Sequence, residues 1–229
     1  MLNYIVLLHL IMGILVSVIV INAYIKSGFK RIGFLVTFGS MGLYSFALSL
    51  PLLISPTNLS LAAWGYVVGI SFIIVVFVWA VKTAPISIIG ITNRWVTTLY
   101  SVLIIGGILS VILHIIGISD PTITVEGFVI WNANLQGAWI LAILSMLIAL
   151  VWSFSYYKSA GLLSNRGNRL KTYVLAFDGF AWAVAAVLYF PAQTELPIIG
   201  AFVLMIGSLL ATSVIFLTLQ FVRKTSIPE

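Results

Sequence analysis

The chain has 229 residues, of which 62% are apolar and only 7% are charged. Soluble domains carry about 25% charged residues, and the mean hydropathy here is +1.22, so a soluble enzyme, a nucleic-acid-binding module and a disordered tail are excluded. The net charge of +6 would suggest nucleic acid as a partner of a soluble chain; here membrane topology explains it. Cysteine is absent, which excludes disulfides, thiolate-bound iron–sulfur clusters and attached c-type haem.

Seven apolar stretches are long enough to cross a bilayer, which takes about 20 residues in a helix. The sequence therefore predicts a single all-α domain over residues 1–229, a multi-pass protein of the cell membrane with seven transmembrane helices. The predicted spans cover approximately residues 4–24, 32–54, 61–81, 96–117, 135–156, 172–190 and 196–222.

The charged residues predict an orientation for these spans. All 11 Lys and Arg residues fall in the first, third and fifth connections or after the last span. The second, fourth and sixth connections hold Asp120, Glu126 and Glu195 instead. Because connections rich in Lys and Arg stay in the cytoplasm, we expect the N-terminus outside and the C-terminus in the cytoplasm.

Two connections have patterns of their own. Residues 118–130 contain Thr122-Ile-Thr-Val-Glu-Gly-Phe-Val, in which polar and apolar side chains alternate at first, and this pattern predicts a small strand or hairpin that caps the outer face. Residues 82–94 are mostly apolar, so we expect this connection to lie in the membrane interface. Trp64 and Trp131 fall near outer ends of spans, where a belt of tryptophans at headgroup level is expected.

Asp178 is the only acidic residue within a predicted span. A carboxylate inside a membrane is costly, so such a residue faces the bundle interior and marks a functional site by default. Trp182 lies four residues further on, over the same helix face. Two interpretations stay open: Asp178 fixes helix packing through hydrogen bonds, or it forms a proton, ion or ligand site.

The two histidines, His9 and His114, fall at similar depths in the outer leaflet of spans one and four. This arrangement permits a haem b held by two imidazoles, whereas a metal site would need more ligands. Asn134 and Gln136 open span five, and we expect spans one, four and five to converge on a cavity open to the outside. The simpler interpretation is a solvated polar rim. The candidate ligand-binding residues are His9, His114, Asn134, Gln136, Asp178 and Trp182.

The turn between the first two spans is Lys26-Ser-Gly-Phe-Lys-Arg, and the turn between spans five and six is Tyr157-Lys-Ser-Ala-Gly-Leu-Leu-Ser-Asn-Arg-Gly-Asn-Arg-Leu-Lys. With the predicted topology, these turns make the chain resemble the seven-helix N-terminal sensor module of prokaryotic histidine kinases. The resemblance implies a signalling role. The sequence departs from that family at Ser226-Ile-Pro-Glu229, where no kinase domain follows. The resemblance therefore implies either a fragment or a stand-alone relative that signals to another membrane protein.

The sequence contains no Gly-x-Ser-x-Gly or His-Glu-x-x-His motif, so no catalytic residue is predicted. We therefore predict a prokaryotic seven-helix receptor or sensor module, not an enzyme, with no cofactor required. Its expected partners are the lipid bilayer and another membrane protein or a second copy, and no nucleic acid. Three alternatives stay open: a subunit of an electron-transfer complex holding haem or quinone near His9 and His114, a small proton- or ion-coupled transporter using Asp178, and an accessory structural subunit.

Overall fold

The computed structural model of the protein describes residues 4–28, 32–83 and 92–225. It confirms the predicted all-α fold, because all seven helices are long and apolar enough to cross a membrane. The chain is therefore a multi-pass membrane protein. The helices are α1 (Tyr4–Ser27), α2 (Ile32–Ile54), α3 (Leu59–Thr83), α4 (Asn93–Ile116), α5 (Leu135–Gly161), α6 (Arg166–Tyr189) and α7 (Glu195–Thr225).

The helix ends differ from the predicted spans where basic residues continue a helix. The bounds of α2 match the prediction, but α5 runs on to Gly161 and α6 begins at Arg166. Hydropathy detects only the apolar part of a helix, whereas Lys and Arg are good helix formers whose long side chains reach out of the membrane. The expectation for the connection 82–94 concerns residues 84–91, which lie outside the described ranges.

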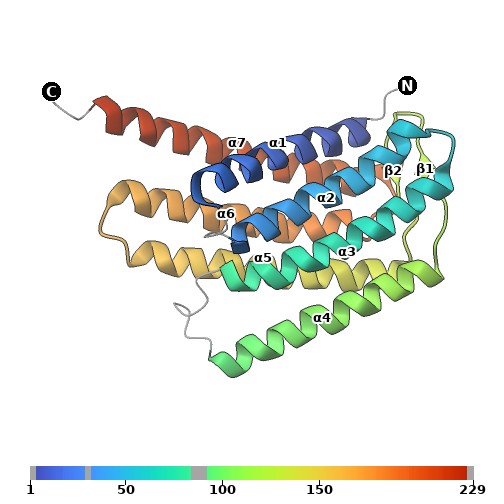
Figure 1. The fold of residues 1–229 in the computed structure, drawn as a ribbon, viewed down its shortest axis with the longest axis horizontal. Coiled ribbons are helices and arrows are strands. Elements are labelled where there is room, and N and C mark those ends of the chain that lie inside the picture. The colour runs from blue at the N-terminus through green and yellow to red at the C-terminus, as the bar shows by residue number, and fades with distance from the viewer. Residues whose placement is uncertain (1–3, 29–31, 84–91, 226–229) are drawn as a thin grey trace.

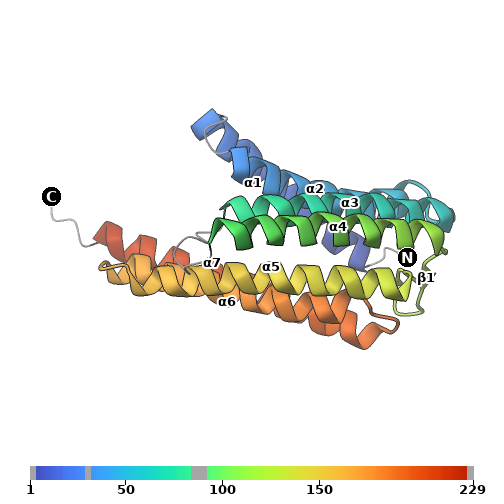
Figure 2. The same cartoon turned by 90° about the horizontal axis from the view of Figure 1, so that it is seen from below.

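Helices that follow one another in the chain pack side by side, and α3 also packs on α5. Figure 2 shows α2, α3 and α4 in one layer and α5, α6 and α7 in a second layer. An apolar groove lies between the first and last helices. This groove is lined by Ile5, Leu8, Phe128, Ile199, Phe202, Val203, Ile206, Gly207 and Leu210.

The connections sort to the two ends of the bundle by charge (Figure 1). The connections α2–α3, α4–α5 and α6–α7 lie at the end that carries Asp120, Glu126 and Glu195. We call it the acidic end. The α5–α6 turn and the C-terminal end of α7 lie at the opposite, basic end.

A small hairpin covers the acidic end, as the alternating sequence predicted. Strand β1 (Thr122–Ile123) pairs antiparallel with β2 (Val129–Ile130). Asn132 follows with a φ of 48°, a left-handed conformation that asparagine tolerates better than most residues. Its Nδ2 donates hydrogen bonds to the Asp120 carbonyl at 2.7 Å and to the Thr122 hydroxyl at 2.8 Å. These bonds fix the exit of the hairpin and so position the neighbouring Trp131.

Candidate functional site

A continuous chain of ring side chains crosses the acidic end, and we call it the aromatic network. It links five different parts of the fold, and none of its members is more than 8% exposed. Its members are His9 of α1, Tyr189 of α6, Trp131 after β2, Tyr66 of α3 and His114 of α4.

Tyr189, the last residue of α6, is the centre of this network. Its hydroxyl lies 3.1 Å from His9 Nε2, in hydrogen-bonding contact, and accepts a hydrogen bond from Trp131 Nε1 at 3.2 Å. The ring of Tyr44, on α2, meets the His9 ring edge-on, with 5.9 Å between the ring centroids. A buried polar group without a partner is costly in a membrane, and this one hydroxyl links α1, α6 and the hairpin exit.

The second half of the network consists of ring contacts. Trp131 stacks on Tyr66 with 5.2 Å between ring centroids and 18° between the planes. Tyr66 in turn meets His114, with centroids 5.5 Å apart. Trp131 is only 7% exposed, whereas Trp64 is 47% exposed. The belt position predicted for Trp131 is therefore wrong: the hairpin turns this indole into the bundle, which the sequence does not signal.

His114 has one satisfied and one unsatisfied ring nitrogen. Its Nδ1 lies 2.7 Å from the backbone carbonyl of Ser110. A carbonyl oxygen can only accept, so Nδ1 carries the proton and Nε2 presents a lone pair. Among the described residues, Nε2 has no hydrogen-bond partner, although His114 is only 2% exposed.

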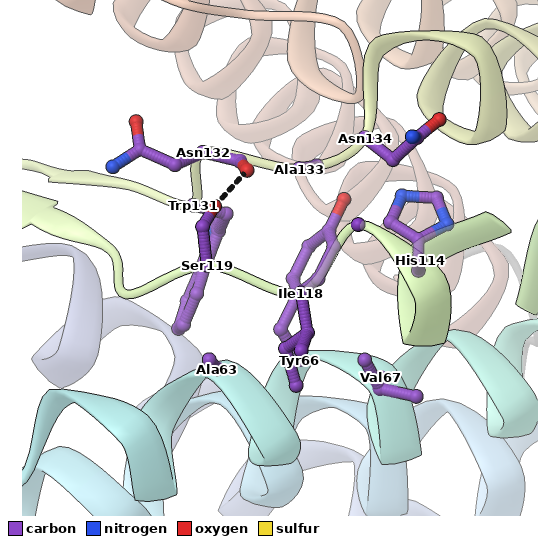
Figure 3. Close-up of a pocket in the computed structure, with 11 residues that line it drawn as sticks. Ala63, Tyr66, Val67, His114, Ile118, Ser119, Trp131, Asn132, Ala133 and Asn134 are labelled. Atoms are coloured by element: carbon purple, nitrogen blue, oxygen red, sulfur yellow. Dashed lines mark hydrogen bonds between the residues drawn. The ribbon is translucent and has the colours of Figure 1, made fainter.

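His114 is one of the residues that line a small pocket at the acidic end, which has room for about one water molecule. In Figure 3 the His114 ring and the hydroxyl end of Tyr66 point into the same space, below Ala133 and Asn134. The exposed residues Ser119 and Asn132 lie at the rim. The pocket is lined by Ala63, Tyr66, Val67, His114, Gly117, Ile118, Ser119, Trp131, Asn132, Ala133 and Asn134.

Close contact between α4 and α5 holds the His114 ring in place. A Cβ added at Gly137 would lie 2.7 Å from two atoms of that ring, so a side chain at this position would displace the imidazole. The Ser110 hydroxyl donates to the Gly137 carbonyl at 2.8 Å. Asn134 begins α5, and its Oδ1 accepts a hydrogen bond from the Gly137 backbone at 3.0 Å. The imidazole is therefore fixed from both helices.

The structure brings together only two of the predicted site residues, His114 and Asn134. His9 does not line the pocket, and Gln136 is exposed and is not part of the lining. The pocket does not have the lining expected from spans one, four and five, because its residues come from α3, α4, the hairpin connection and the start of α5, and none from α1.

The two imidazoles do not face each other, since Tyr189, Trp131 and Tyr66 lie between them. This arrangement does not offer the paired ligands of a bis-histidine haem. Among the described residues, no group of three His, Cys, Asp or Glu side chains could hold a metal ion. With room for about one water molecule, the pocket is also far smaller than the usual ligand pockets of about 300 Å³ or more.

Asp178 forms a separate polar contact, between α6 and α7. Thr212 donates its hydroxyl to Asp178 Oδ2 at 2.6 Å, and Oδ1 has no partner among the described residues. The hydroxyl of Ser208 lies beside the carboxyl but donates to the Met205 carbonyl at 3.1 Å. Trp182, four residues further along α6, is half-buried and does not line the His114 pocket.

The next residue, Gly179, packs tightly against α5. A Cβ there would lie 3.0 Å from the Ser153 backbone nitrogen and 3.1 Å from the Ala149 carbonyl. One face of α6 is therefore occupied by α5 and the Asp178 face by α7, so Asp178 does not belong to the site at the acidic end.

Sequence reasoning found His114 and Asn134 because polar side chains in spans are rare. It missed Tyr66, Trp131 and Tyr189, because aromatic residues near span ends are common in every membrane protein. Comparisons with protein families, with curated proteins and with solved structures find no match to this chain.

Proposed function

We propose that this protein is a seven-helix sensor or receptor-type module of the cell membrane, without catalytic activity of its own. The observation that carries the proposal is the small pocket at the acidic end, whose walls include one end of the aromatic network. A ligand in that pocket contacts side chains that are linked to α1 and α6 through Tyr189 and His9.

The network provides a physical route from the pocket to the helices. Tyr66 and Trp131 both line the pocket, and Trp131 is hydrogen-bonded to the hydroxyl that also holds His9. A ligand shifts a conformational equilibrium by the difference in its affinity for the two states. Displacement of Trp131 on binding therefore changes the contacts of α1 and α6, and shifts of 1–2 Å between helices are a common switching motion.

The alternatives have less support. A haem-binding subunit needs two facing imidazoles, and three side chains lie between His9 and His114. A transporter that uses Asp178 needs a path to it, and neither the pocket at the acidic end nor the apolar groove between α1 and α7 includes this carboxyl. The main competitor is an accessory structural subunit, which would use the same network as a rigid support.

A distance measurement at the basic end separates the sensor from the rigid support. The chain contains no cysteine, so spin labels attach only at introduced cysteines, here Ile25→Cys and Leu162→Cys, positions that are 75% and 73% exposed. Removal of the central hydroxyl by Tyr189→Phe should shift the label-to-label distance by about 1–2 Å or more. Tyr4→Phe, at a 66% exposed tyrosine of the acidic end, is the control. Equal distances in the two folded variants would contradict the sensor proposal.

The proposal places the acidic end outside the cell, because all 11 basic residues belong to the other side and such connections remain cytoplasmic. A reporter that is active only in the cytoplasm should work when fused after Glu229 and fail when fused after Asn58. Activity at Asn58 would reverse the orientation and place the pocket inside the cell.

A further inference from the structure

The bundle is open along the seam between its first and last helices. Every helix packs on its neighbours in the chain, but α1 and α7 do not pack closely on each other over the residues that the structure describes. In Figure 2 the two helices separate toward the basic end. The groove in this seam has a volume of about 360 Å³, which is within the usual range of ligand sites.

The walls of the groove are entirely apolar. The α7 residues that line it, from Ile199 to Leu210, recur at intervals of three and four and therefore share one face of the helix. Ile5 and Leu8 of α1 form the opposite wall, and Phe128 of the hairpin connection adds a ring. Because no polar side chain is among the lining residues, the groove favours a hydrocarbon occupant.

The length of the groove matches one leaflet of a bilayer. Leu210 follows Ile199 by 11 residues, about 16 Å along the axis of a helix, and the hydrocarbon core of a bilayer is about 30 Å thick. The residues from Ala211 to Ile215 are described too, and none of them lines the groove. A transmembrane helix of a partner would follow α7 through both leaflets, whereas an extended acyl chain belongs to one.

Gly207 leaves a hollow in the α7 face of the groove. A Cβ added there would have no heavy atom of the described residues within 4 Å. The adjacent lining residues Val203 and Leu210 are 65% and 61% exposed, so the rest of the chain does not cover this face. An empty hollow forfeits dispersion contacts on all its walls. A flexible chain that fills the hollow recovers these contacts.

The groove begins at an end of the bundle that carries negative charge. Glu195 precedes Ile199 by about one helical turn, and Glu126 lies two residues before Phe128. Every Lys and Arg of the chain belongs to the other connections or follows the last span. A surface of one sign attracts the opposite sign, so a headgroup with an ammonium group is favoured over a purely anionic one.

We propose that this groove holds one acyl chain of phosphatidylethanolamine from the leaflet at the acidic end. The chain contacts Phe202, whose ring lies 5.8 Å, between centroids, from the rings of both His9 and Tyr189. The bound lipid therefore closes the seam between α1 and α7 and supports the centre of the aromatic network. This site is separate from the pocket beside His114, and the inference goes beyond the proposed sensor function without depending on it.

Photocrosslinking tests the lipid site directly. Phosphatidylethanolamine with a diazirine in one acyl chain is added to the protein in nanodiscs of phosphatidylethanolamine and phosphatidylglycerol. Its crosslinks, mapped on peptides, should saturate and concentrate between Ile199 and Leu210. The α4 face around Ile105, which is 68% exposed, reports contact with bulk lipid. A phosphatidylglycerol probe with the same chains should react about fivefold less in the groove, the effect of about one charge at a membrane surface.

Variants at two glycines separate the groove from the rest of the lipid surface. Gly207→Leu fills the hollow and should lower groove crosslinking about tenfold, the effect of losing the burial of about two methylene groups. Gly39→Leu, on α2, is the matched control, because its added Cβ also has nothing within 4 Å and it does not line the groove. Gly207→Ala should give a smaller loss, and it keeps the test decisive if the leucine variant does not fold.

The proposal is overturned if the phosphatidylethanolamine probe reacts no more in the groove than around Ile105, or if both Gly207 variants react like the unchanged protein. Equal reaction of the two probes would overturn the headgroup assignment. A disulfide between two copies through Gly207→Cys, in a chain without other cysteines, would assign the groove to a second copy and also overturn it. If the lipid binds as expected while Tyr189→Phe leaves the label distances unchanged, the lipid site stands and the sensor function falls.

Discussion

His9 and His114 are similar in burial and different in their bonding. Both lie near the acidic end, at 7% and 2% exposure, and both contact a tyrosine ring. His9 Nε2 has a hydroxyl partner on Tyr189, whereas His114 Nε2 has none among the described residues. Burial by itself therefore does not show whether both ring nitrogens of a histidine have partners.

The difference arises from where each partner lies in the chain. The partner of His9 is on α6, 180 residues away, so this contact ties two helices together. His114 bonds to the carbonyl of Ser110, four residues earlier on the same helix. That local bond orients the ring and leaves its other nitrogen without a partner among the described residues. The first two predictions below act mainly on one of the two histidines, the last concerns Asp178, and they run from the largest expected effect to the smallest.

The largest effect is expected at the glycine that packs against His114. Gly137→Ala places a Cβ 2.7 Å from the imidazole and 3.1 Å from the Ser110 carbonyl, and overpacking of this kind costs up to about 3 kcal/mol. Thermal unfolding in detergent should show the loss. Gly161→Ala, at the other end of α5 and with nothing within 4 Å of the added Cβ, should be neutral. Equal stability of the two variants would show that α4 and α5 are not in close contact.

The next effect distinguishes the two halves of the aromatic network. Tyr189→Phe removes the partner of both Trp131 Nε1 and His9 Nε2 and should lower the free energy of unfolding by about 2 kcal/mol. Tyr66→Phe keeps the ring stacked on Trp131 and should cost less than about 0.5 kcal/mol in the absence of ligand. Chemical unfolding of both variants checks this order. The reverse order would move the centre of the network from α6 to α3.

The smallest effect is expected at Asp178, a half-buried polar residue that resembles His114 in having one satisfied atom and one unsatisfied atom. Asp178→Asn can still accept the Thr212 hydroxyl and should change stability little. Asp178→Leu leaves that hydroxyl without its partner, and such interhelical bonds contribute about 0.6 kcal/mol on average in membranes. Thr212→Val removes the same interhelical bond from the other side. Thr218→Val is its matched control, because the Thr218 hydroxyl donates only within its own helix.

Function separates the two interpretations of Asp178 better than stability does. If Asp178→Asn folds normally but abolishes signalling or transport, the ionised form of the carboxyl is required and the transporter alternative gains support. If Asp178→Leu changes neither folding nor activity, this residue has no structural or functional role, and its hydrogen bond to Thr212 does not stabilise the α6–α7 contact.

The sequence alone determined the features that depend on a local property of the chain. Hydropathy located seven helices, and for α2 it also located both ends. Alternation of polar and apolar residues identified the hairpin. The rarity of polar side chains in spans pointed to His114 and Asn134, which line one pocket. Each of these signals is contained in fewer than 30 consecutive residues, about the length of a membrane-spanning helix.

Only the tertiary structure decided which polar groups meet. His9 and Tyr189 are 180 residues apart, and Trp131 and Tyr189 are 58 residues apart, so nothing in either local sequence specifies the contact. The burial of Trp131 depends on the turn that Asn132 makes after the hairpin. The free nitrogen of His114 depends on which neighbours the packing of α3, α4 and α5 leaves beside it. Hydrogen bonding inside a membrane is satisfied between helices, so the partner of a polar residue is a property of the bundle and not of the span that carries it.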